Sequence, residues 1–149
     1  MALEQEVMQK MKEAMKAKDT VALASYRSIK SEILKAKTAS ANKDDMSEAE
    51  ELKLVQKLVK QRKDSAQTYK EQNREDLAEA ELEEAKIIEQ FLPAQLSEEE
   101  IGKEVEAIIA ETGASSMKDM GKVMGLASQR LAGKADGKTI SKIVKEKLS

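Results

Sequence analysis

The sequence contains no cysteine, histidine or tryptophan, and its 149 residues include one proline, one phenylalanine and two tyrosines. Without cysteine there is no disulfide and no thiolate for catalysis or metal binding. Without histidine the chain lacks the commonest metal ligand and the commonest general base. The core must be built from aliphatic residues and methionine. The scarcity of proline and of alternating β-branched residues predicts an all-α protein.

Other signals are missing as well. No apolar run is long enough to span a bilayer, and the first residues lack the apolar core of a signal peptide, which predicts a soluble, cytoplasmic protein with no membrane partner. The chain has no GxxxxGK[ST] phosphate loop, and its serines lie mostly at predicted helix starts and loops, where capping explains them. We therefore predict no catalytic residue, no metal site and no cofactor.

Charge is distributed unevenly along the chain. Lysine and arginine exceed acidic residues by four over residues 1–70 and by five over residues 112–149, whereas residues 71–111 carry a net charge of −11. A polyanion would be attracted to either end and repelled by the middle. The simplest explanation of most of the acidic residues is a solvated helix face.

Apolar periodicity predicts five helices before the C-terminal segment. Their approximate ranges are 2–17, 20–41, 48–71, 74–91 and 98–112. We expect Met8 and Met15 of the first helix, Ala24 and Leu34 of the second, and Ala80 and Leu82 of the fourth, to face the core. The only proline, Pro93, disfavours helix before it and marks a boundary. The predicted architecture is an N-terminal antiparallel helical unit, 1–92, followed by a small C-terminal three-helix bundle, 97–149.

One basic patch lies in the predicted third helix and comprises Lys57, Lys60, Arg62 and Lys63. It has no interleaved aromatic residues on which bases could stack. We interpret it as solvated charge, with a phosphate-facing surface as the alternative.

The segment from Gly113 to Leu148 predicts a helix, a turn and a second helix. Ser116 can cap the first helix, Gly133 can end it in a left-handed conformation, and Asp136 can cap the second. Gly121 and Gly125 fall inside the first helix, where each costs about 1 kcal/mol relative to alanine. On a helical wheel they share a stripe of small residues with Ser128 and Ala132, and Lys118, Lys122 and Gln129 border that stripe.

A smooth groove edged by lysines lets another backbone approach closely. That backbone is either a neighbouring helix or the sugar-phosphate chain of an RNA, for which lysines and peptide N–H groups are suitable contacts. In the second case lysines neutralise phosphates while the glycines keep the surface open. The candidate nucleic-acid-binding residues are Lys118, Gly121, Lys122, Gly125, Gly133, Lys134 and Lys138.

These residues carry a resemblance to a known family. DMGKVMG, followed by GKADG and an aliphatic helix, resembles the GatB/YqeY domain, found in small stand-alone proteins and in the tail of the B subunit of the tRNA-dependent glutamyl/aspartyl amidotransferase. The resemblance implies an all-helical fold. It also implies a tail that helps to hold tRNA, with the chemistry in other domains. The matching positions are Gly121, Gly125, Gly133, Lys134 and Ala135. Asp136-Gly137 departs from the Asn-Pro that the tail commonly has.

Three functions follow from the residues and the resemblance. The first is a non-catalytic tRNA-binding accessory module, with tRNA as partner. The second is a helical protein–protein adaptor. The third is a component of a glutamine-dependent carbon–nitrogen ligase, an association that exists at the level of the family and finds poor support in the residues. We favour the first.

Overall fold

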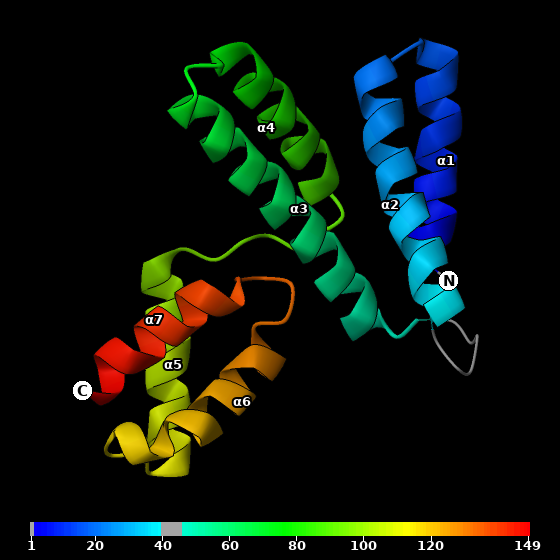
Figure 1. Cartoon of the computed structure of the whole chain (residues 1–149). Helices are drawn as coiled ribbons and strands as arrows, with labels where there is room; N and C mark the ends of the chain where they lie inside the picture. Colours follow the sequence, from blue (N-terminus) through cyan, green and yellow to red (C-terminus); the bar gives the residue numbers. More distant parts are fainter. Residues whose placement is uncertain (1, 40–45) are drawn as a thin grey trace. The chain divides into compact units, whose positions relative to one another are not determined.

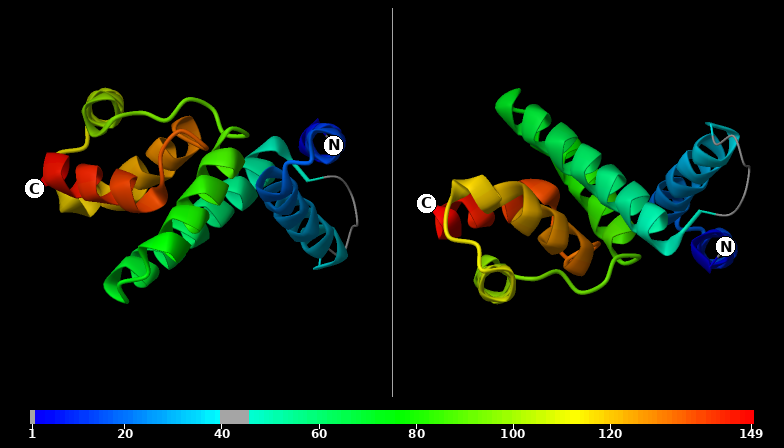
Figure 2. Two further views of the ribbon diagram at one scale, coloured as in Figure 1. Left: turned by 90° about the horizontal axis from the view of Figure 1, so that it is seen from above. Right: turned by 90° about the horizontal axis from the view of Figure 1, so that it is seen from below.

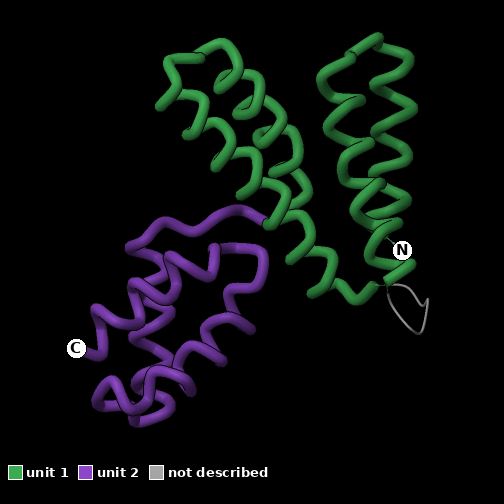
Figure 3. The backbone as a smooth tube through the Cα atoms, viewed as in Figure 1, with its two compact units in different colours: residues 1–92 green, residues 93–149 purple. Residues whose placement is uncertain are grey.

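The computed structural model describes residues 2–39 and 46–149, and every regular element in these ranges is helical (Figure 1). The predicted all-α class is confirmed. The chain divides into two compact units, Met1–Leu92 and Pro93–Ser149 (Figure 3). Within the described ranges, no helix has both the length and the apolar character needed to cross a bilayer.

The N-terminal unit is built from two helical hairpins. Its elements are α1 (Ala2–Ala17), α2 (Thr20–Ala39), α3 (Glu48–Glu71) and α4 (Glu75–Glu89). Helices α1 and α2 lie side by side, as do α3 and α4 (Figures 1 and 2), and α2 also packs against α3 and α4. The second helix is described as far as Ala39, and the end predicted for it near residue 41 lies outside the described residues.

Helix starts in this unit follow from local capping. The Asp19 carboxylate accepts a hydrogen bond from the Ala22 N–H at 3.0 Å. Ser47 and Glu50 form a reciprocal capping box at the start of α3. Each cap satisfies backbone donors that have no partner inside the helix, so the sequence determines these boundaries locally.

The core of the N-terminal unit is aliphatic with a single aromatic pair. Tyr26 packs edge-to-face against Phe91, with ring centroids 5.9 Å apart and planes at 84°. Gln90 donates a hydrogen bond from Nε2 to the Tyr26 hydroxyl at 3.1 Å. The pair joins α2 to the end of α4 and gives the buried phenol a polar partner, as such groups usually require. Side chains with no or almost no exposure around this pair include Val7, Ile29, Ile33, Val55 and Ile88.

Six residues expected in this core are on the surface, and these predictions were wrong; two of them are Ala24 and Leu34 of α2. Met8 is 41% exposed, Met15 is 58% exposed and Leu82 is 37% exposed, and Ala80 is also exposed. The reason is that α1 packs chiefly against α2, so a narrow stripe of it is buried. In both α1 and α4, the buried residues recur at intervals of three, four or seven, which places them on one side of the helix. The buried residues are Leu3, Val7 and Ala14 in α1 and Ala78, Ala85 and Ile88 in α4.

In the basic patch of α3, Lys57, Lys60 and Lys63 are exposed, as expected of solvated charge, and Arg62 is the exception. Arg62 is partly buried, with Nε 3.1 Å from a Glu84 oxygen and Nη2 donating to the Ser28 hydroxyl at 3.1 Å. Lys60 pairs with Asp64 of α3 at 3.0 Å, and Lys63 pairs with Glu89 of α4 at 3.7 Å. Arg62 therefore links three helices and is not a solvated charge.

The C-terminal unit consists of three helices, each in contact with the other two. Its elements are α5 (Glu98–Thr112), a 3₁₀ turn (Met117–Asp119), α6 (Met120–Arg130) and α7 (Gly137–Leu148). Helix α5 begins at a Ser97–Glu100 capping box and ends at Gly113, whose φ of 70° is left-handed. Val105, Ile108, Val123 and Val144 are fully buried at the centre of the unit.

Candidate nucleic-acid interface

The start of α6 differs from the prediction. The Ser116 hydroxyl accepts a hydrogen bond from the Lys118 N–H at 3.3 Å, but the turn that it caps is 3₁₀, and α6 begins only at Met120. Gly121 is therefore the second residue of α6, where a glycine costs less than in the interior. Gly125 alone lies in the middle of the helix.

The stripe of small residues on α6 is open within the C-terminal unit. Gly121, Gly125 and Ser128 are exposed, and Ala132 just beyond the helix is half-buried. A Cβ atom built on Gly121 or on Gly125 meets no atom within 4 Å. Val123, on the other side of the same helix, is fully buried. The helix is thus held by its apolar face, and this unit places no neighbouring helix over the glycines.

Gly133 contributes a turn rather than an open surface. It is buried, and its φ of 78° is left-handed, as predicted. Its carbonyl oxygen accepts a hydrogen bond from Gln95 Nε2 at 2.7 Å, and the Leu96 N–H donates to the Lys134 carbonyl oxygen at 3.0 Å. The segment after Pro93 therefore fixes the turn between α6 and α7.

The start of α7 confirms the predicted cap. Asp136 Oδ1 accepts a hydrogen bond from the Thr139 N–H at 2.9 Å. The carboxylate at this turn thus has a defined structural role. Four residues anchor α7 to the unit: Ile140, Ile143, Val144 and Leu148.

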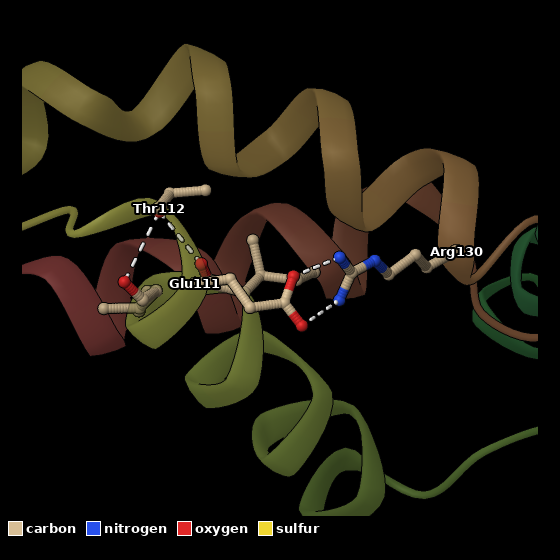
Figure 4. A network of polar contacts seen from close by, with 5 residues as sticks. Glu111, Thr112 and Arg130 are labelled. Atoms are coloured by element: carbon tan, nitrogen blue, oxygen red, sulfur yellow. Dashed lines mark hydrogen bonds and ion pairs between the residues drawn. The ribbon is translucent and has the colours of Figure 1, made fainter.

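Acidic residues of α5 neutralise three of the basic residues that follow it. Arg130 and Glu111 form a bidentate pair, in which Nη1 donates to Oε1 at 3.1 Å and Nη2 donates to Oε2 (Figure 4). Lys142 Nζ lies 3.5 Å from a carboxylate oxygen of Glu98, and Lys147 Nζ lies 2.5 Å from a carboxylate oxygen of Glu106. Hydrogen bonds from Arg130 lower the pKa of Glu111 below its ordinary value. In the same view, the Thr112 hydroxyl donates to backbone carbonyls of α5, so it is not available to a ligand.

Five lysines after residue 112 remain exposed, and across residues 2–39 and 46–149 no ion pair engages them. They are Lys118, Lys122, Lys134, Lys138 and Lys145. The first four are the lysines predicted as phosphate contacts. Lys145 was missed, although its spacing of seven from Lys138 places the two on one face of α7.

The structure does not gather the predicted lysines into a single cluster. Lys118 and Lys122 lie at the start of α6, whereas Lys134 and Lys138 follow its end. The 11 residues of α6 span about 16 Å at 1.5 Å per residue. An extended polymer could contact both sites, whereas a small anion could reach only one. No group of three or more acidic side chains in the described part of the chain is arranged to hold a metal ion.

The two helical units, the second of which carries several exposed lysines, define an all-helical protein. Comparison with known families gives a match over residues 4–148 to the family described as "Yqey-like protein". The chain belongs to this YqeY-like family.

Individual relatives support the same assignment. The chain is 36% identical over 107 residues to "Altered inheritance of mitochondria protein 41, mitochondrial" of Clavispora lusitaniae, covering 70% of this chain and 61% of that protein. The protein of the same name from Vanderwaltozyma polyspora is 35% identical over 116 residues, covering 74% and 62%. That from Kluyveromyces lactis is 32% identical over 134 residues, covering 89% and 68%. The chain thus matches about six tenths of the length of the first two relatives.

Proposed function

We propose that this YqeY-like protein is a non-catalytic tRNA-binding accessory module whose C-terminal unit recognises the RNA backbone. The observation that carries the proposal is the division of the basic residues after position 112. Three are paired with α5, and five lysines have no carboxylate partner among the described residues. Uncompensated lysines on a fixed scaffold are suited to phosphate groups.

The open stripe on α6 supports the same function. Gly125 occupies a helix interior where alanine would be more stable, and nothing in the unit covers it. A glycine there allows a ligand backbone to approach the helix closely, next to Lys122. The resemblance of this segment to the tail of the amidotransferase B subunit makes tRNA the favoured ligand.

The side chains give little support to catalysis by this chain. Amide transfer needs an activated nucleophile and a base, and the sequence has neither cysteine nor histidine. Ser97 and Ser116 cap helices, and the buried Ser25 hydroxyl donates to the Val21 carbonyl oxygen at 3.0 Å. We therefore assign any carbon–nitrogen ligase activity with glutamine as donor to other proteins. Turnover of glutamine and misacylated tRNA by this chain alone would contradict that assignment.

The binding test uses bulk tRNA and the full chain at two salt concentrations. Lys122→Glu and Gly125→Leu should each weaken binding while the helical circular dichroism spectrum is retained. Lys103→Glu is the matched charge control, because Lys103 is an exposed lysine on the acidic helix α5. Ala107→Leu, also exposed on α5, is the matched control for added bulk. Absence of tRNA binding at low salt would remove the proposal.

The open stripe also supports a second candidate, a helical protein–protein adaptor, because small residues allow a partner helix to pack closely. Affinity purification that recovers one protein in stoichiometric amount, sensitive to Gly125→Leu and insensitive to Lys122→Glu, would favour the adaptor. The cytoplasmic localisation predicted from the sequence remains a proposal, and the relatives above carry the word "mitochondrial" in their names. Cell fractionation tests it.

A further inference from the structure

The outer face of α7 carries three lysines in a line. Lys138, Lys142 and Lys145 are spaced by four and then three residues, so at about 100° per residue they fall within a sector of about 60°. All three are exposed. The buried residues of α7, centred on Ile140 and Val144, lie on the opposite side of the helix. Helix α7 is thus fixed through one face and presents the lysines on the other.

A shallow surface depression with a volume of 670 Å³ follows this face. Its lining residues are Glu98, Lys138, Thr139, Ser141, Lys142, Lys145 and Glu146. The hydroxyl groups of Thr139 and Ser141 line the same depression and add hydrogen-bond donors on either side of the lysines, and such groups commonly contact phosphate.

The carboxylates of this face do not block an anion. The Lys142–Glu98 pair has a separation of 3.5 Å and side chains that are 59% and 66% exposed. Such exposed pairs contribute little free energy, about 0 to 1 kcal/mol, so a phosphate can replace Glu98. Lys138 and Lys145 pair with no carboxylate in the described ranges, and Glu146 lies at the edge of the lysine sector. The face therefore carries three lysines against two carboxylates.

The composition of the C-terminal unit restricts which nucleic acid it can bind. Residues 93–149 contain no phenylalanine, tyrosine or tryptophan. Unpaired bases are bound mainly by stacking on aromatic rings or on arginine guanidinium planes. The one arginine of this unit, Arg130, is held in its bidentate pair with Glu111. The unit can contact phosphates and hydroxyls, but it offers no platform for splayed bases.

We propose that the α7 lysine face, defined by Lys138, Lys142 and Lys145, is a second RNA contact and that its ligand is the phosphate backbone of double-helical RNA. This inference rests on the function proposed above, and it adds Lys142 and Lys145 to the lysines predicted from the sequence as RNA contacts. From Lys138 to Lys145 the helix rises about 10 Å. That length spans more than one phosphate of a strand, because successive phosphates of a double helix lie a few ångström apart along the axis, about 3.4 Å in B-DNA.

The test compares an RNA hairpin that has a fully paired stem with an unpaired RNA of the same length. The variant is Lys142→Ala/Lys145→Ala in the full chain. Each lost phosphate contact makes the plot of log affinity against log salt concentration shallower by about 0.9. Relative to 1 M salt, one lost contact therefore lowers the affinity at 0.1 M salt about eightfold, and two lost contacts lower it about 60-fold. Lys142→Arg/Lys145→Arg retains both charges and should retain binding.

The matched control is Lys103→Ala/Lys147→Ala, which removes the same net charge from the same unit. Lys147 pairs with Glu106 and packs its stem near Gly102, away from the lysine face. A loss of about twofold is expected from long-range charge alone. Equal losses in the control and the test variant would overturn the inference, as would hairpin binding that the test variant leaves unchanged.

Three further outcomes relate this inference to the proposed function. Binding that is lost with Lys122→Glu and unchanged with Lys142→Ala/Lys145→Ala keeps the tRNA-binding function and removes the α7 contact. Unpaired RNA that binds as tightly as the hairpin overturns the assignment of double-helical RNA. Failure of the wild-type chain to bind tRNA or hairpin at low salt removes both.

Discussion

Replacement of Gly125 by alanine should stabilise the C-terminal unit while weakening its binding to tRNA. A Cβ atom at this position meets nothing within 4 Å, so the added methyl group causes no clash. Gly125 lies in the interior of α6, where alanine is favoured over glycine by about 0.8 to 1 kcal/mol. The expected stabilisation is therefore about 1 kcal/mol. It should be smaller for Gly121→Ala, because Gly121 is the second residue of the helix.

Native-state amide hydrogen exchange measures this gain in stability at individual residues of α6. A gain of about 1 kcal/mol slows exchange about fivefold for amides that open together with α6, such as those of Val123 and Ala127. Ala107→Gly, at an exposed position of α5, is the reverse control and should cost a similar free energy. The tRNA affinity of the same variants is then measured by titration.

Two results would refute this reasoning. A loss of stability in Gly125→Ala would mean that the methyl group meets a neighbour and that the stripe is not open. A gain of stability with unchanged tRNA affinity would mean that close approach of a ligand does not explain the glycine. If close approach of tRNA explains Gly125, its replacement by alanine raises the stability of the C-terminal unit and lowers the affinity for tRNA.

Three further predictions concern packing and charge. Ile108→Ala removes a fully buried side chain and should lower the free energy of unfolding of the C-terminal unit by about 2 to 5 kcal/mol, measured by urea titration; a cost under 1 kcal/mol would contradict the assigned core. Arg62→Ala leaves the partly buried Glu84 carboxylate without its partner and should cost the N-terminal unit about 1 to 3 kcal/mol, whereas Glu84→Gln should cost less. Because Arg130 lowers the pKa of Glu111 below 4.5, the pair stabilises the folded state above that pH, and the contribution disappears as pH falls through the lowered pKa. Glu111→Gln should therefore be less stable than wild type at about pH 6, with a difference that narrows towards about pH 3 in urea titrations; a difference independent of pH would contradict the assignment.

Features that depend on a few neighbouring residues were predictable from the sequence. Asp19, Ser47, Ser97 and Asp136 cap helices as expected, because a cap is a hydrogen bond between residues two or three apart. The left-handed conformation of Gly133 was predictable for the same local reason.

Features that depend on contacts between helices were not predictable. Met8 and Leu82 fit an amphipathic pattern, but whether such a residue is buried depends on how many neighbours its helix has. The Arg62–Glu84 pair joins residues on two helices, so the sequence pattern did not show that Arg62, unlike the exposed lysines around it, is held by a carboxylate of another helix. A local pattern also did not show that Ser116 caps a 3₁₀ turn before α6.

The candidate site was predicted in part, for a related reason. Spacing placed Gly125 on an open stripe, but it gave no account of which lysines would pair with the acidic helix α5. Lys142 and Lys147 pair with it, and Lys145 does not. This selection follows from the packing of α7 on α5, which brings together residues about forty positions apart.

The most direct test of the central claim is a map of tRNA contacts on the isotopically labelled full chain, obtained from amide chemical shifts during titration with tRNA. Shifts should appear around Lys118, Lys122 and Gly125 and in the turn at Lys134, and they should diminish as salt is raised. Shifts confined to residues 2–39 and 46–92, or an unchanged spectrum with excess tRNA at low salt, would contradict that claim.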